Sequence, residues 1–114
     1  MNFPPESELE ITPAEVAAIL AARTPFRLID CREADEWQVC HLDGAELVPL
    51  SSFAEIAAAR FTDPAQAIVI HCHHGMRSAR ATAWLRSRGF PRTWSMAGGI
   101  DLWSETIDPA IPRY

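Results

Sequence analysis

The chain has 114 residues, of which 48% are hydrophobic and 22% charged, so we expect residues 1–114 to form one ordinary globular domain. A net charge of −5 argues against a nucleic-acid-binding protein. No apolar stretch approaches the roughly 20 residues that span a membrane, and the acidic N-terminus lacks the pattern of a signal peptide, so we expect no membrane association.

Strands and helices are predicted to alternate along the chain. Thr12 begins a helix, because Pro13 follows at the first helical position and Glu15 stands three residues after the cap. In chain order we predict a strand at 9–11, a helix at 12–22, a strand at 26–30, a helix at 33–39, a strand at 45–48, a helix at 52–60, a strand at 67–71, a helix at 78–88, a strand at 93–96 and a helical turn at 101–104. This order predicts an α/β fold with helices covering both faces of a parallel sheet.

A cysteine stands where a predicted strand gives way to a predicted helix. Cys72 follows the apolar, β-branched run at 67–70, and the next helix is expected to begin at Ser78. The free N–H groups and the dipole of a helix N-terminus favour negative charge and hence a thiolate. Ligands also bind outside the carboxyl ends of parallel strands, where Asp30 would lie as well. The turn is therefore a candidate site for a reactive sulfur and an anion.

Three cysteines, Cys31, Cys40 and Cys72, are present. An odd, small number is typical of free thiols in a reducing compartment, so we expect a cytoplasmic protein. No Cys-x-x-Cys or His-x-x-x-His spacing occurs, and we expect neither a metal site nor a cofactor.

Charge is distributed unevenly around Cys72. Residues 64–100 contain five arginines and no acidic residue. Two interpretations remain open: a solvated helix face formed by Arg80, Arg86, Arg88 and Arg92, or a positive field that attracts a small anion. Arg77 lies inside the turn itself, and we expect it to face the site rather than bulk solvent.

Three motifs together resemble the rhodanese-like sulfurtransferase family. The run Cys72–Ser78 is similar to its active-site loop. Residues Leu28–Arg32, followed by Glu36-Trp37 and by His41–Ala45, resemble its upstream motif. Residues Ser95–Trp103 resemble its downstream motif. The likeness covers about residues 10–104 and leaves 105–114 as an extended surface strap.

The resemblance implies a three-layer α/β/α sandwich around a parallel sheet of about five strands. It also implies that Cys72 takes sulfane sulfur from a small anionic donor such as thiosulfate, holds it as a persulfide, and passes it to a thiol or to cyanide. The four residues between Cys72 and Arg77 match the loop length that the family associates with sulfur transfer. Related phosphatases on this fold have one residue more, which makes phosphatase activity improbable here.

The resemblance also implies roles for the loop residues. The substrate-binding residues would be His73, His74, Gly75, Met76, Arg77 and Ser78. Gly75 would permit the tight turn, Arg77 would bind sulfonate-like oxygens, and Ser78 would cap the following helix. For the two histidines, two roles stay open: hydrogen bonding or titration near the sulfur, and simple exposure at the rim.

Asp30 and Arg32 are expected to support the site through a charge-assisted hydrogen bond rather than to react. Cys31 is expected to be a small buried hydrophobe, and Cys40 an inert thiol, although a resolving role against Cys72 is conceivable.

Two functions remain: an enzyme that turns over thiosulfate, and a sulfur carrier that is loaded by a dedicated protein partner.

Overall fold

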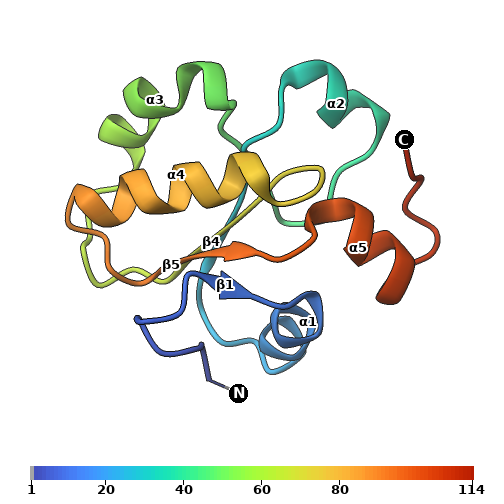
Figure 1. Cartoon of the computed structure of the whole chain (residues 1–114), viewed down its shortest axis with the longest axis horizontal. Helices are drawn as coiled ribbons and strands as arrows, with labels where there is room; N and C mark the ends of the chain where they lie inside the picture. Colours follow the sequence, from blue (N-terminus) through green and yellow to red (C-terminus); the bar gives the residue numbers. More distant parts are fainter. Residues whose placement is uncertain (1) are drawn as a thin grey trace.

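The computed structural model describes residues 2–114 and shows a five-stranded sheet with helices on both faces (Figure 1). The strands are β1 (Glu10–Ile11), β2 (Arg27–Asp30), β3 (Glu46–Leu47), β4 (Ile68–His71) and β5 (Thr93–Met96). The helices are α1 (Pro13–Ala21), α2 (Ala34–Val39), α3 (Phe53–Arg60), preceded by the 3-10 turn η1 (Leu50–Ser52), α4 (Met76–Ser87) and α5 (Gly99–Thr106). The strand order is β1-β5-β4-β2-β3, and each neighbouring pair is parallel. The predicted α/β fold with a parallel sheet of five strands is confirmed.

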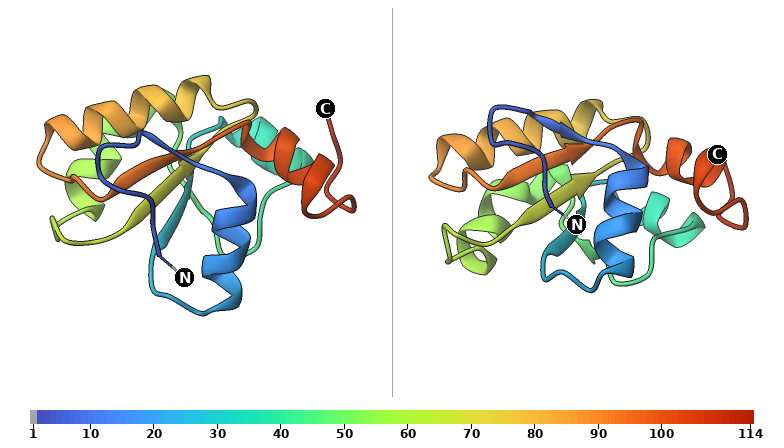
Figure 2. Two further views of the ribbon diagram at one scale, coloured as in Figure 1. Left: turned by 60° about the horizontal axis from the view of Figure 1, so that its bottom comes forward. Right: turned by 90° about the horizontal axis from the view of Figure 1, so that it is seen from below.

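Two buried clusters lie on opposite faces of the sheet. Helices α1 and α5 cover one face, and α3 and α4 cover the other (Figure 2). Because side chains alternate along a strand, Val69 of β4 packs on the α1/α5 side whereas Ile68 and Ile70 pack on the α3/α4 side. Cys31 and Cys72 both belong to the α3/α4 cluster. The sheet therefore brings these two thiols to the same side.

The local signals for helix starts were partly right. Thr12 caps α1 with the complete reciprocal pair of hydrogen bonds to Glu15 that the sequence predicts. Helix α4, in contrast, begins at Met76, two residues before the predicted start, and its N-cap is Gly75. The prediction that Ser78 caps this helix was wrong: Ser78 lies inside the first turn, where its hydroxyl donates to the carbonyl of Gly75 at 3.2 Å. The helix starts early because Gly75 adopts a left-handed φ of +109° that closes the loop sharply.

The carboxyl ends of the strands carry the connections that matter for function. The loop after β4 leads directly into α4, and α2 follows β2 at the same end of the sheet. The chain after α5 runs back towards α2 (Figure 1). It ends with the Tyr114 hydroxyl between Arg32 and Glu36. Within residues 2–114, no helix has the length and apolar character needed to cross a membrane.

Candidate active site

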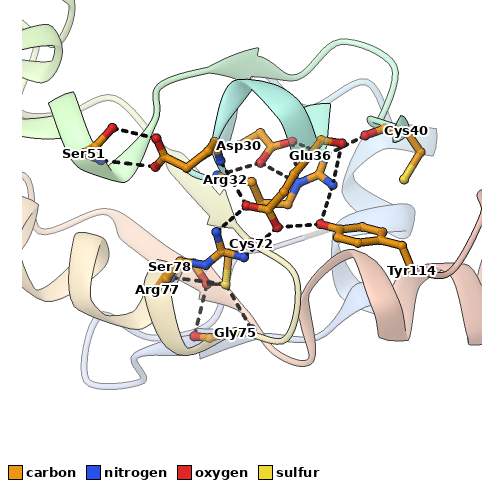
Figure 3. Close-up of polar contacts among 11 residues, drawn as sticks. Asp30, Arg32, Glu36, Cys40, Ser51, Cys72, Gly75, Arg77, Ser78 and Tyr114 are labelled. Atoms are coloured by element: carbon orange, nitrogen blue, oxygen red, sulfur yellow. Dashed lines mark hydrogen bonds and ion pairs between the residues drawn. The ribbon is translucent and has the colours of Figure 1, made fainter. Parts of the chain in front are cut away.

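The Cys72 sulfur sits in a cradle of hydrogen-bond donors at the end of β4 (Figure 3). Cys72 is 1% exposed. Its Sγ accepts from the backbone N–H of Gly75 at 3.1 Å and of Ser78 at 3.4 Å, and it lies 3.5 Å from the Ser78 hydroxyl oxygen. The two N–H groups belong to the first turn of α4 and its cap, which have no partners within the helix. The loop thus directs two backbone N–H groups at one sulfur atom.

The same surroundings lower the pKa of Cys72 to about 4. The largest cause is hydrogen bonding from the Cys31 thiol; burial opposes it, and the hydroxyl and backbone N–H of Ser78 and the N–H of Gly75 add to it. The pKa of Cys31 is raised, first by its hydrogen bond to Cys72 and then by burial, so Cys31 keeps its proton. These surroundings therefore favour the thiolate form of Cys72.

The sheet register explains why Cys31 lies beside Cys72. Asp30 of β2 is paired with His71 of β4, and the N–H of Cys31 donates to the carbonyl of His71 at 3.0 Å. Each cysteine directly follows its strand, so the two come side by side. Cys31 is buried, as the sequence predicts, but its place beside Cys72 was missed. The sequence does place a cysteine directly after each of two strands. That the two thiols are neighbours, however, follows only from the pairing of β2 with β4.

Helix α5 holds the loop from behind. The N–H of Ile100 donates to the carbonyl of Cys72 at 2.8 Å, and the N–H of Asp101 donates to that of His73 at 3.1 Å. Gly99 allows this approach, because its φ is +60° and a Cβ there would clash with the carbonyl oxygens of Cys72 and His73. The downstream motif is thus the structural support of the Cys72 loop.

Asp30 and Arg32 form a fully buried ion pair below the loop. Arg32 Nη2 lies 2.7 Å from Asp30 Oδ2, and both side chains are 0% exposed. The guanidinium also donates to the carbonyl of Cys40 at 2.6 Å and to the Tyr114 hydroxyl at 2.8 Å. A buried arginine with this many acceptors is fixed in place, and it ties β2 to the chain after α2 and to the C-terminal segment.

Arg77 is part of a second ionic group, at the rim of the loop (Figure 3). Its Nη1 and Nη2 donate to the two carboxylate oxygens of Glu36 at 2.5 and 2.9 Å, and the Tyr114 hydroxyl donates to the same carboxylate at 2.8 Å. Glu36 and Tyr114 were not among the predicted site residues. They come from α2 and the C-terminal segment, 41 and 37 positions away from Arg77, and nothing in the sequence pairs them with it.

The two histidines and Met76 form the outer edge of the loop. The His73 ring stacks on Tyr114 with centroids 4.0 Å apart, and burial followed by the neighbouring His74 lowers its pKa. The His74 side chain is 64% exposed, with Nδ1 3.8 Å from an Asp101 carboxylate oxygen. Met76 is 81% exposed. His73 is thus packed against the C-terminal segment, whereas His74 and Met76 face solvent.

The other arginines of the acid-free segment contact different parts of the molecule. Arg86 donates to three backbone carbonyls, among them that of Thr93 at 2.8 Å. Arg88 lies over Trp84, and Arg92 lies over Phe3. Arg86 and Arg92 are therefore tied to other segments rather than facing solvent freely, while Arg77 is held at the Cys72 loop.

Cys40 is separated from Cys72 by the sheet. It packs in the α1/α5 cluster, whereas Cys72 belongs to the α3/α4 cluster, and its thiol donates to the carbonyl of Pro112 at 3.5 Å. This placement argues against Cys40 as a resolving thiol. Within residues 2–114, no group of three or more histidine, cysteine or acidic side chains converges in a way that would hold a metal ion.

Comparison with known proteins agrees with this geometry. Residues 12–106 match the family model of the rhodanese-like domain. The chain is 33% identical over 104 residues to a probable adenylyltransferase/sulfurtransferase MoeZ of Mycobacterium tuberculosis; the match covers 91% of the chain but only 26% of that protein. It is 31% identical over 105 residues to the thiosulfate sulfurtransferase GlpE of Pseudomonas fluorescens, covering 92% of the chain and 94% of GlpE.

Solved structures show the same fold. A rhodanese-like domain protein from Staphylococcus aureus superposes with a TM-score of 0.77 at 22% identity, over 92% of this chain and 97% of that one. The human single-domain sulfurtransferase TSTD1 does so with a TM-score of 0.74 at 24% identity, over 86% and 96%. With a family match over most of its length, a five-stranded parallel sheet and a cysteine loop at the end of β4, this chain belongs to the rhodanese-like domain family.

Proposed function

We propose that this chain is a sulfurtransferase that moves sulfane sulfur from thiosulfate or a persulfide donor to a thiophilic acceptor through a persulfide on Cys72. The observation that carries the proposal is the buried Cys72 sulfur with two backbone N–H groups directed at it, surroundings that also lower the pKa of this thiol to about 4. Family membership and the relatives named as sulfurtransferases support it.

The chemistry proceeds in two displacements. The Cys72 thiolate attacks the outer sulfur of thiosulfate; a new S–S bond forms, the old one breaks, and sulfite leaves with the electron pair. An acceptor thiolate or cyanide then attacks the outer sulfur of the persulfide, and the Cys72 thiolate leaves. Sulfur moves between nucleophiles, so no external oxidant or reductant is required. Such a covalent intermediate predicts ping-pong kinetics.

The hydrogen-bond donors around Cys72 suit both of its anionic forms, the thiolate and the persulfide. Neutral donors from Gly75, Ser78 and Cys31 stabilise negative charge on sulfur without bringing in a competing ion. A low thiol pKa also makes Cys72 a good leaving group in the second displacement. We place this chemistry in a reducing compartment such as the cytoplasm, because it depends on a free thiol.

A second function is a sulfur carrier that is loaded by a protein partner and turns over little free thiosulfate. Two observations favour it. Several relatives are larger proteins, named as both adenylyltransferase and sulfurtransferase, of which the chain spans about a quarter. In addition, Glu36 occupies the Arg77 guanidinium that would attract a free anionic donor.

Steady-state kinetics separates the two functions. With thiosulfate and cyanide, an enzyme forms thiocyanate at every turnover. Double-reciprocal plots of rate against the concentration of one substrate, at several fixed concentrations of the other, then give parallel lines. A carrier gives little thiocyanate from thiosulfate but forms it in one burst after loading by a persulfide donor such as a cysteine desulfurase. Absence of thiocyanate under both conditions would contradict sulfur transfer altogether.

A further inference from the structure

We propose that Glu36 is a specificity-determining residue: it holds Arg77 in a closed ion pair at the rim, so that a small free anion must compete with this carboxylate to reach the Cys72 loop. The inference rests on the proposed function and deepens it. It predicts that the chain discriminates against free dianionic donors such as thiosulfate, and that this discrimination resides in one carboxylate.

The ion pair engages both terminal nitrogens of Arg77. Nη1 and Nη2 each donate to a different oxygen of Glu36, at 2.5 and 2.9 Å. This fork-to-fork geometry is the one in which arginine also binds the oxygens of a sulfonate or phosphate. Glu36 therefore occupies the position of an anionic ligand on Arg77.

A third residue fixes the carboxylate in place. The Tyr114 hydroxyl donates to Glu36 Oε2 at 2.8 Å and accepts from the buried Arg32 at 2.8 Å, while its ring stacks on His73. Glu36 is consequently held from two sides, and its side chain is only 19% exposed. Hydrogen bonding from Arg77, helped by Tyr114, also lowers the pKa of Glu36 to about 2, so the carboxylate is ionised at any working pH.

The charge balance at the rim decides what a donor meets. With Glu36 present, the guanidinium and the carboxylate cancel, and the remaining attraction for an anion comes from the neutral donors of the loop. A thiosulfate dianion approaching the sulfur therefore gains little from Arg77, because repulsion by Glu36 offsets the attraction of the guanidinium. An interaction with one such charge at a partly exposed site changes affinity by about threefold to tenfold.

The first arm of the test removes only the charge of the carboxylate. Glu36→Gln keeps a hydrogen-bonding side chain of the same length, and we expect its KM for thiosulfate to fall by about threefold to tenfold, with kcat within about twofold of wild type. Glu46→Gln is the matched control, since Glu46 forms a similar two-point ion pair with Arg27 at the β2–β3 edge. We expect this control to leave both constants unchanged, and circular dichroism checks that each variant is folded.

The second arm is a double-mutant cycle with Arg77→Ala. That change alone leaves Glu36 without its partner beside the loop, so the KM for thiosulfate should rise by about tenfold or more. Adding Glu36→Gln removes the repelling charge, and the KM of the double variant should return to within about threefold of wild type.

The opposite pattern would overturn the inference. If Glu36 merely oriented Arg77 to clamp the donor, Glu36→Gln would raise the KM, and the double variant would be no better than Arg77→Ala. Failure of the proposed function looks different: mass spectrometry would then detect no persulfide on wild-type Cys72 with any donor. A persulfide that forms normally, together with an unchanged or raised KM in Glu36→Gln, would reject the role of Glu36 alone.

Discussion

The inner and outer sides of the Cys72 loop are built on different principles. On the inner side, buried neutral groups from Cys31, Gly75 and Ser78 surround the sulfur. On the outer side, partly exposed ionic side chains, chiefly Arg77 and Glu36, pair with one another. Neutral buried donors respond little to salt or pH, whereas exposed charges are screened. We therefore propose that the inner side sets the reactivity of the sulfur, and that the rim sets which donors reach it.

The largest effect should come from the sulfur itself. Cys72→Ser replaces the thiolate by a hydroxyl that does not ionise near neutral pH, so thiocyanate formation from thiosulfate and cyanide should fall by more than about a thousandfold. Cys40→Ser is the matched control and should keep most of the activity, because Cys40 lies on the other face of the sheet. Loss of activity in the Cys40 variant alone would contradict the assignment of the nucleophile.

A methyl group at Gly99 should disturb the inner side of the loop, because it interferes with the packing of α5 against that loop. Gly99→Ala places a Cβ against the carbonyls of Cys72 and His73, at a residue whose φ is +60°. We expect the free energy of unfolding to fall by about 2–4 kcal/mol. Gly44→Ala carries a similar positive φ of +80° with no atom within 4 Å of the added Cβ, so its cost should be only about 1 kcal/mol. Urea unfolding of both variants measures the difference, and equal costs would show that the close approach of α5 is unimportant.

Removing the Cys31 thiol should weaken the inner side without touching the rim. We expect Cys31→Val to raise the pKa of Cys72, because a donor to the thiolate is lost, while Cys31→Ser keeps a donor and stays near wild type. The rate of alkylation by iodoacetamide against pH reports the thiolate, which forms as pH rises through its pKa. The midpoint for Cys31→Val should move upward by about one to two pH units, so reactivity near pH 5 is lost first. Identical pH profiles of alkylation for Cys31→Val and Cys31→Ser would show that Cys31 does not lower the pKa of Cys72.

The smallest effect concerns the arginines beyond the rim. Arg80 is exposed on α4, about one helical turn past Arg77. If the acid-free segment acted as a general positive field, Arg80→Gln would raise the KM for thiosulfate several-fold at low salt. We expect a change below about twofold, since a fully solvated charge contributes little. Measurements at two ionic strengths distinguish these outcomes.

The inner side could largely be predicted from the sequence, and the rim could not. The strand before Cys72 and the glycine after it are local signals, and with the family motifs they indicated an anion-stabilising loop. The partnership of Cys31 with Cys72 needed the order of β2 and β4 in the sheet. The pairing of Arg77 with Glu36 and Tyr114 joins residues 41 and 37 positions apart, and their contact depends on how α2 and the C-terminal segment pack. The sequence places the start of α4 at Ser78, because serine is a common N-cap residue, whereas the left-handed Gly75 ends the loop earlier.

We propose that Cys72 carries sulfane sulfur. Intact-protein mass spectrometry after incubation with thiosulfate tests it most directly. We predict a gain of about 32 Da, one sulfur atom, that peptide mapping places on Cys72, that disappears on addition of cyanide, and that is absent from Cys72→Ser. A protein that gains no sulfur from thiosulfate or from a persulfide donor, or gains it equally without Cys72, would contradict the account.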